Sequence, residues 1–197
     1  MILPRDFYTR SDVVLIAREL LGKRLVTEFN GIMTSGIITE TEAYAGVTDK
    51  ASHAYGGRQT ERTGIMYREG GTAYVYLCYG IHSLFNVVTN LPGIPHAVLI
   101  RGIKPEEGIQ MMQNRTGKTG ITLKSGNGPG KVAKLLGIHY SHSGIDMVDK
   151  EMRKPAIFIE NTEIQILPSS IIKSSRIGVD YAGEDALLPY RFLYNPE

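Results

Sequence analysis

The chain has 197 residues, of which 42% are hydrophobic and 21% are charged, and its formal net charge is +2. This size and composition are typical of one soluble globular domain, and the lack of any run of about 18 apolar residues excludes a membrane-spanning helix. The N-terminus reaches its first charged side chain at Arg5 and lacks the apolar stretch of a signal peptide. We therefore expect residues 1–197 to form one domain that works in the cytosol, away from membranes.

Cys78 is the only cysteine, which excludes an internal disulfide and a cysteine-based metal site. His139 and His142 have a spacing that could bind a metal on a helix, but their segment lacks helical character and nearby acidic ligands. We interpret them as solvated loop histidines and predict no metal. The small net charge permits nucleic-acid binding without arguing for it, because DNA-binding domains are usually more basic.

The first predicted elements are a helix and a hairpin. A Ser-Asp cap at residues 11–12 starts a helix that runs to about Leu21, with apolar residues at helical spacing. Residues 23–29 predict a strand, Asn-Gly at 30–31 is a strong signal for a hairpin turn, and residues 33–44 predict the return strand.

The middle of the chain predicts an antiparallel meander of three strands, over residues 74–79, 83–89 and 96–103. Gly80 lets the chain turn between the first two strands, which form a protruding hairpin. The later elements we expect are a helix opened by proline at 105–114, a mobile polar loop at 116–128, a short helix at 129–136, a pair of strands at 156–160 and 163–167, and a strand at 189–194 that packs back on the domain. Antiparallel strands with peripheral helices predict an α+β fold.

Glu40, Glu42 and Tyr44 share one face of their predicted strand, because side chains on a strand alternate. Two carboxylates beside a tyrosine suit acid–base chemistry at a glycosidic bond. From this segment alone, a solvated strand face is the simpler alternative.

Aromatic and basic side chains gather in two other segments. A glycine-rich loop contains His53 and Arg58 and is a reasonable binding surface. Tyr74 and Tyr76 share a strand face and could stack on an extruded base, whereas Tyr79 at the hairpin tip could wedge between stacked bases. A surface histidine and ordinary tyrosines of a sheet core are the alternatives.

Asn86 and Arg101 stand in apolar strands, where a polar side chain must find partners or line a cavity. The GNGPGK segment precedes a predicted helix but fails the Walker pattern, because Ser125 and Val132 occupy two of its required positions. Its free backbone N–H groups, with Lys131, could still hold a DNA phosphate. Structural hydrogen bonds and a plain loop–helix junction are the alternatives.

Taken together, these segments resemble the alkyladenine DNA glycosylase family. Each motif is weak alone, but they occur in order over nearly the whole chain, which makes the resemblance specific. The motifs are GIITETEAY at 36–44, SHAYGGRQTER at 52–62, TAYVYLCYGIHSLFNVV at 72–88, AVLIRGIKPEEG at 97–108, GNGPGKVAKLLGI at 126–138, RIGVDYAGEDA at 176–186 and RFL at 191–193.

The resemblance implies a role for each matching position. Glu42 matches the carboxylate that activates water, and Arg101 matches the arginine beside that water and the sugar-phosphate backbone. Tyr44 and His53 match residues that sandwich the flipped base, and Tyr76 matches the aromatic on its other side. We expect Arg101 to help keep Glu42 ionised, and His53 is the best-placed acid for neutral bases.

The remaining matches concern the DNA. Tyr79 matches the tyrosine that fills the vacated space in the minor groove, and Asn86 matches the asparagine that clashes with the amino group of normal guanine. Ile81 and His82 replace bulkier residues beside this wedge, which changes how tightly the gap is plugged. Arg58 and Lys131 are expected to contact DNA, and Glu40 is interpreted as structural.

The resemblance implies a minimal bacterial glycosylase, monomeric and associated with the nucleoid when bound to DNA. It would flip 3-methyladenine, 7-methylguanine, and as further candidates hypoxanthine and ethenoadenine, out of double-stranded DNA and hydrolyse the glycosidic bond. No lysine lies in the Glu42 segment or in the tyrosine hairpin, so we expect no Schiff base, no lyase activity and no cofactor.

Two alternative functions are open. The fold could be a non-catalytic module that binds damaged DNA or RNA, stacking bases on its tyrosines. It could also be a hydrolase of free nucleosides or glycosides that uses Glu40 and Glu42 as a pair. A carboxylate that repels phosphate argues against the first, and the hairpin tyrosine has no role in the second.

Overall fold

The structure, a computed structural model, describes residues 1–149, 151 and 154–196. Within these residues, eight strands form one antiparallel sheet, in which six follow the order β3-β4-β5-β2-β1-β6, while β8 pairs with β2 and β7. The strands are β1 (Arg24–Phe29), β2 (Ile32–Tyr44), β3 (Ala73–Cys78), β4 (His82–Thr89), β5 (His96–Glu107), β6 (Ala156–Glu160), β7 (Ile172–Ser174) and β8 (Arg191–Leu193).

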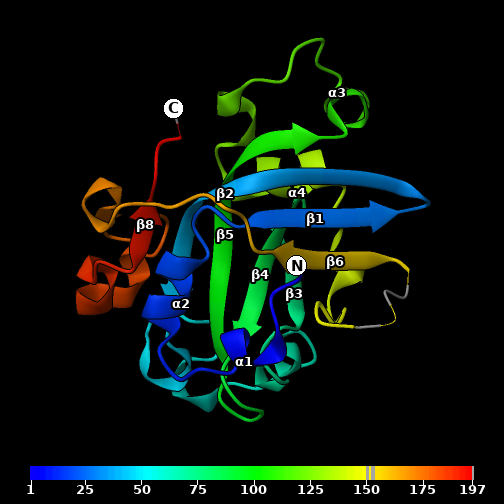
Figure 1. Ribbon diagram of the computed structural model, residues 1–197. Helices are drawn as coiled ribbons and strands as arrows, with labels where there is room; N and C mark the ends of the chain where they lie inside the picture. Colours follow the sequence, from blue (N-terminus) through cyan, green and yellow to red (C-terminus); the bar gives the residue numbers. More distant parts are fainter. Residues whose placement is uncertain (150, 152–153, 197) are drawn as a thin grey trace.

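Short helices surround this sheet, which confirms the predicted α+β class (Figure 1). The α-helices are α1 (Arg5–Tyr8), α2 (Val13–Glu19), α3 (Ile109–Thr116) and α4 (Pro129–Leu136). The 3-10 helices are η1 (Gly46–Thr48), η2 (Tyr55–Gly57), η3 (Thr63–Tyr67), η4 (Leu123–Gly126), η5 (Tyr140–His142), η6 (Pro168–Ser170) and η7 (Asp180–Leu187). In the described part of the chain, no helix has the length and apolar character that crossing a membrane requires.

The long strands β2 and β5 form the spine of the sheet, and they change direction along their length. Their pairing has irregularities between Ser35 and Gly36 and on both sides of Glu40. Such bulges bend a strand and re-aim its side chains. Figure 1 accordingly shows β1, β6 and the first part of β2 crossing β3, β4 and β5 at a steep angle.

Side chains alternate along each strand, so the two faces of the sheet carry different sets of residues. One face carries the main core, in which α2 and α4 pack on β2, β4 and β5. Asp12 caps α2 by accepting a hydrogen bond from the backbone N–H of Leu15, as the sequence predicts. The opposite face carries Glu42, Tyr44, Tyr74, Tyr76, Asn86, Leu99 and Arg101, and most of these side chains line a cavity.

The prediction of a helix at 105–114 is wrong for residues 105–107, which belong to a strand. β5 continues to Glu107 because residues 104–107 pair with β2, and Pro105 lies opposite Gly36. The helix begins only after Gly108, whose left-handed backbone (φ 76°) ends the strand. Long-range strand pairing therefore overrides the local helix signal of proline followed by two glutamates.

Of the two strands predicted at 156–160 and 163–167, only the first is confirmed. β6 forms at 156–160, but residues 163–167 form no strand. One edge of β6 pairs with β1, and the other is contacted by the N-terminus, where Ile2 bridges Glu160 and the N–H of Leu3 donates to the carbonyl of Ile159. The N-terminal residues thus lie along the edge of β6 where the predicted strand at 163–167 would have paired.

The C-terminal segment packs back as a strand, as predicted. β8 pairs with residues 40–42 of β2, and the unpredicted strand β7 pairs with β8. The stretch 116–128 includes η4, and Gly126 lies so close to the carbonyl of Ile103 that a β-carbon would meet it at 2.0 Å. The start of α4 is therefore packed tightly against β5.

Candidate active site

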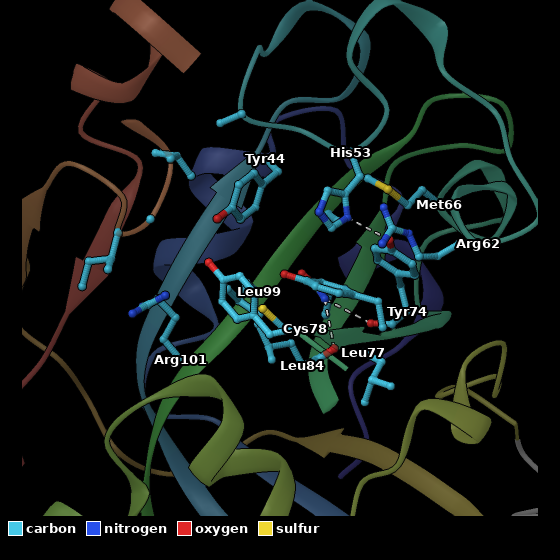
Figure 2. A pocket seen from close by; sticks show the side chains of 18 of the residues that line it. Tyr44, His53, Arg62, Met66, Tyr74, Leu77, Cys78, Leu84, Leu99 and Arg101 are labelled. Carbon is cyan, nitrogen blue, oxygen red and sulfur yellow. Dashed lines mark hydrogen bonds between the residues drawn. The ribbon is translucent and has the colours of Figure 1, made fainter. Parts of the chain in front are cut away.

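A cavity of about 420 Å³ opens on the face of the sheet opposite the main core. Figure 2 shows Tyr44 and Arg101 on one side of it, and His53, Arg62 and Tyr74 on the other. This size is ordinary for a site that takes a small organic group. Aromatic and polar side chains dominate its walls, which is unusual for an empty structural gap.

Glu42 is completely buried directly behind the wall of this cavity. Its Oε1 accepts a 2.8 Å hydrogen bond from the backbone N–H of Ile177, and its Oε2 accepts a 2.8 Å hydrogen bond from the hydroxyl of Tyr44. Nε of Arg101 lies 3.3 Å from Oε1. All three partners line the cavity, so the carboxylate is separated from it by one layer of atoms.

Burial raises the pKa of Glu42 above its ordinary value. Arg101, the Ile177 N–H and the Tyr44 hydroxyl each lower this pKa, and the nearby charge of Glu40 raises it. The expected effect of Arg101 on Glu42 is therefore present, but desolvation outweighs it. A carboxylate with a raised pKa and specific partners beside a cavity is typical of a group that exchanges protons.

Glu40 holds the two arginines at the edge of the site. Its Oε1 accepts hydrogen bonds from Nε of Arg101 at 3.1 Å and from Nε of Arg191 at 2.6 Å. These contacts match the structural interpretation of Glu40. They also fix Arg101 between two carboxylates, because its Nε faces both of them.

The far wall of the cavity is a cluster of three rings. Nδ1 of His53 lies 2.9 Å from the hydroxyl of Tyr74, and the ring of Tyr76 stands edge-on to His53 with centroids 4.6 Å apart. Burial, followed by the charges of Arg62 and Arg58, lowers the pKa of His53 from 6.5 to about 4. His53 is therefore neutral at pH 7, which weakens its expected role as an acid.

Asn86 lines the same cavity and is 4% exposed. Its amide nitrogen donates to the backbone carbonyls of Tyr74 and Leu84. These two bonds orient the side chain, and no hydrogen bond to its amide oxygen is found among the described residues. The amide nitrogen of Asn86 is thus held by the backbone, and its amide oxygen can accept a hydrogen bond from a molecule in the cavity.

The hairpin of β3 and β4 ends beside the mouth of the cavity. Tyr79 is 92% exposed and Ile81 is 73% exposed, although both are large apolar side chains. Tyr79 has a left-handed backbone (φ 50°), as does Gly80, and together they make the turn. The ring of Tyr79 contributes nothing to the core, although it also borders the cavity.

Two comparisons decide the family. The sequence profile of the methylpurine-DNA glycosylase family matches residues 6–197. A protein of Chlamydia felis is 46% identical over 98% of this chain and 96% of its own, and one of Chlamydia pneumoniae is 44% identical over 100% and 96%. Another of Clostridium perfringens is 42% identical over 98% and 95%. The names of all three describe them as candidate 3-methyladenine DNA glycosylases.

The chain belongs to the methylpurine-DNA glycosylase family. It is therefore a DNA glycosylase of base excision repair, and the resemblance read from the sequence is confirmed. The cavity brings together the residues that sequence reasoning assigned to base binding and water activation, which are Glu42, Tyr44, His53, Tyr76, Asn86 and Arg101. Arg58 and Lys131 are exposed outside the cavity lining.

Sequence reasoning missed part of this glycosylase site. Arg62 lies above the ring of Tyr76, with 5.9 Å between its guanidinium carbon and the ring centroid. Ile177 and Tyr181 close the cavity from the C-terminal segment, and Arg176 is buried behind them. The RIGVDYAGEDA motif contains three of these residues, so the resemblance marked this segment although it assigned no role to them.

The histidines near residue 140 take part in local packing. The ring of His142 stacks on Phe29 at 4.2 Å, and Nδ1 of His139 lies 2.8 Å from the hydroxyl of Ser141. Among the described residues, no group of three His, Cys, Asp or Glu side chains is gathered as metal ligands would be.

Proposed function

We propose that this glycosylase releases alkylated purines from double-stranded DNA, by flipping the nucleotide into the cavity and hydrolysing its N-glycosidic bond with a water activated by Glu42. An abasic site remains. The observation that carries this proposal is the contact of one buried carboxylate with Tyr44, Arg101 and Ile177, which together form the wall of an aromatic cavity.

The cavity suits a flat base with positive charge. Tyr44 and Tyr76 both line it, and His53, which stands edge-on to Tyr76, is neutral at pH 7. Electron-rich rings attract cations, which favours 3-methyladenine and 7-methylguanine. Hypoxanthine and ethenoadenine are neutral and need a proton donor at the leaving group, so we infer that they are released more slowly. Asn86 would oppose the amino group of normal guanine.

Glu42 would act as the general base. Its Oε2 accepts only the Tyr44 hydrogen bond among the described residues, which leaves a lone pair for a water molecule. Because Glu42 is fully buried behind the cavity wall, this water would reach the carboxylate when the wall opens as DNA binds. The ionised carboxylate would take a proton from that water as it attacks the sugar, and its charge would stabilise the developing oxocarbenium ion. Arg101, held by Glu40, would steady the carboxylate and the neighbouring sugar-phosphate.

The exposed hairpin would maintain the flipped state. Unstacking a nucleotide costs a few kcal/mol, and a ring inserted into the gap returns part of it. Tyr79 has the exposure that insertion requires, and Ile81 would support it from the same turn. Arg58 and Lys131, the latter at the start of α4, would contact phosphates.

Hydrolysis would be direct and cofactor-free. No lysine is among the described residues that line the cavity, so a Schiff base with the sugar has no donor there. We therefore propose a monofunctional enzyme without strand cleavage, which works as a monomer in the bacterial cytosol on damaged double-stranded DNA.

The proposal is tested by base release from methylated duplex DNA. Wild type should release 3-methyladenine, and Glu42→Gln should lose about 10²-fold or more of the single-turnover rate while binding an abasic duplex normally. Glu163→Gln, an exposed carboxylate outside the cavity lining, is the matched control and should behave as wild type. No release by wild type at any concentration would favour a non-catalytic binder, and activity on free nucleosides would favour another hydrolase.

A further inference from the structure

Arg176 and Asp49 form a buried ion pair immediately behind the cavity. The side chains are 0% and 2% exposed, and the guanidinium binds the carboxylate in a fork, with N–O distances of 2.5 and 2.9 Å. The two residues are 127 positions apart in the chain. A buried ion pair is weak evidence for stability, because apolar residues of similar volume often fill such a space as well.

The pair joins three segments that meet at the site. Besides its bonds to Asp49, Arg176 donates from Nη1 to the carbonyl of Ala43 and from Nη2 to the carbonyl of Asp185. All four N–H groups on its terminal nitrogens are therefore used. Asp49 in turn accepts hydrogen bonds from the backbone N–H groups of Ala45 and Ala51.

Arg176 also adjoins two of the three groups that contact Glu42. It precedes Ile177, whose backbone N–H donates to Oε1 of Glu42. Its guanidinium carbon lies 4.9 Å from the centroid of the Tyr44 ring, whose hydroxyl donates to Oε2 of Glu42. Rotating or withdrawing Arg176 would therefore disturb the donor to each oxygen of the carboxylate.

We propose that Arg176 and Asp49 are positioning residues for the reaction, which clamp the Ile177 N–H and the Tyr44 ring so that both donors stay on the Glu42 carboxylate. This inference rests on the proposed role of Glu42 as general base. Neither Arg176 nor Asp49 has to touch the base or the water. Their effect passes through one backbone N–H and one phenol.

The clamp has a defined electrostatic consequence. The Ile177 N–H and the Tyr44 hydroxyl lower the pKa of Glu42, so they offset part of its desolvation. If the clamp is lost, this pKa rises and the ionised base disappears at a higher pH. The other charged or titratable groups that face Glu42 are Arg101 from β5, Glu40 from β2, Tyr76 from β3, Arg176 itself and, through Glu40, Arg191 from β8.

The first test is Arg176→Lys, which keeps the positive charge and loses the fork. We expect the acid limb of the single-turnover pH profile to move to higher pH, with a loss of about 10²-fold at pH 6 that shrinks at pH 8. Affinity for an abasic duplex should be unchanged. Arg5→Lys is the matched control, because Arg5 pairs with Asp146 at 2.7 Å on the surface away from the cavity.

A second variant covers the case in which Arg176→Lys does not fold. Replacing Ile177 by its α-hydroxy acid keeps the side chain and substitutes an ester oxygen for the N–H. We expect the same displacement of the acid limb. An unchanged profile in either folded variant, or an equal loss at every pH, would overturn the clamp and leave the pair a purely structural one. Inactive wild type would instead refute the proposed function itself.

Discussion

The hydroxyl of Tyr44 donates a 2.8 Å hydrogen bond to Oε2 of Glu42, two residues earlier on the same strand. Strand alternation places both side chains on the cavity face of β2. Burial raises the pKa of the Tyr44 hydroxyl well above its ordinary value, and the charge of Glu42 adds to the effect. The phenol therefore stays protonated and can serve both as a wall for the base and as a donor to the carboxylate.

Tyr44→Phe separates these two tasks. The ring remains, so binding of a flipped base should change little. The Tyr44 hydroxyl stabilises the ionised form of Glu42, so its removal raises the pKa of the Glu42 carboxyl further. Because a hydrogen bond to a charged group is worth about 1.5–3 kcal/mol, we expect base release at pH 6 to fall about tenfold or more.

The comparison for Tyr44→Phe is Tyr181→Phe, which removes another hydroxyl from the cavity lining. The Tyr181 hydroxyl donates to the carbonyl of Ala51 and does not bind Glu42. We expect its pH profile to match that of wild type. Equal losses in both variants would mean that any cavity hydroxyl matters, and would contradict a specific effect on Glu42.

Glu42 is expected to cost the protein stability. Its folded-state pKa is raised, chiefly by burial, so the environment as a whole disfavours the charged form. The free energy of unfolding therefore increases as the pH falls through the folded-state pKa of Glu42. Above that pKa, the full destabilisation by the buried charge is present. Glu42→Gln should stabilise the protein by about 0.5–2 kcal/mol at pH 7.5 and so raise its melting temperature. The difference in melting temperature between variant and wild type should shrink toward acid pH.

Calorimetry of both proteins between pH 4.5 and 8 checks this expectation, and Glu163→Gln provides the baseline for an exposed site. If Glu42→Gln melted below wild type at pH 7.5, the lost contacts to Arg101 and Ile177 would outweigh desolvation. The sign of the difference thus measures which of the two opposing terms prevails.

His53 is expected to titrate far below an ordinary histidine. Burial, together with Arg62 and Arg58, lowers its pKa from 6.5 to about 4. The unfolded chain therefore takes up the proton first, and the protein loses stability as the pH falls from about 6.5 toward 4. NMR of the imidazole protons, assigned by comparison with His53→Gln, should give a midpoint near 4. A midpoint above 6 would restore His53 as an acid for neutral bases.

Much of the site follows from local sequence rules. Period-two alternation groups Glu42 with Tyr44 and Tyr74 with Tyr76, and the Asn-Gly turn sets the register of β1 and β2. The same rules predict the exposed turn at Tyr79. The resemblance to a known family supplied the roles of these residues, which alternation cannot give.

Long-range contacts account for what sequence reasoning missed. The pairing of residues 104–107 with β2 turned an expected helix start into strand. The contact between Arg176 and Asp49 joins segments with no shared periodicity, so no local pattern signals it. The same holds for the Ile177 N–H on Glu42, since a backbone donor leaves no mark on residue type.

Tyr79→Ala tests the exposed hairpin. The side chain is 92% exposed, so its removal should change the free energy of unfolding by no more than about 0.5 kcal/mol. Base stacking is worth about 1–3 kcal/mol, so release of 3-methyladenine from duplex DNA should fall about 10- to 100-fold. In single-stranded DNA no gap has to be filled, and the loss should be smaller.

The matched control for Tyr79→Ala is Tyr140→Ala, a tyrosine that is 48% exposed and does not line the cavity. It should release the base from both substrates as wild type does. Fluorescence of 2-aminopurine placed beside the lesion reports flipping independently of chemistry, and Tyr79→Ala should shorten the lifetime of the flipped state. An equal loss on single and double strands would contradict insertion into the duplex and would place Tyr79 in the cavity wall instead, where it also has a surface.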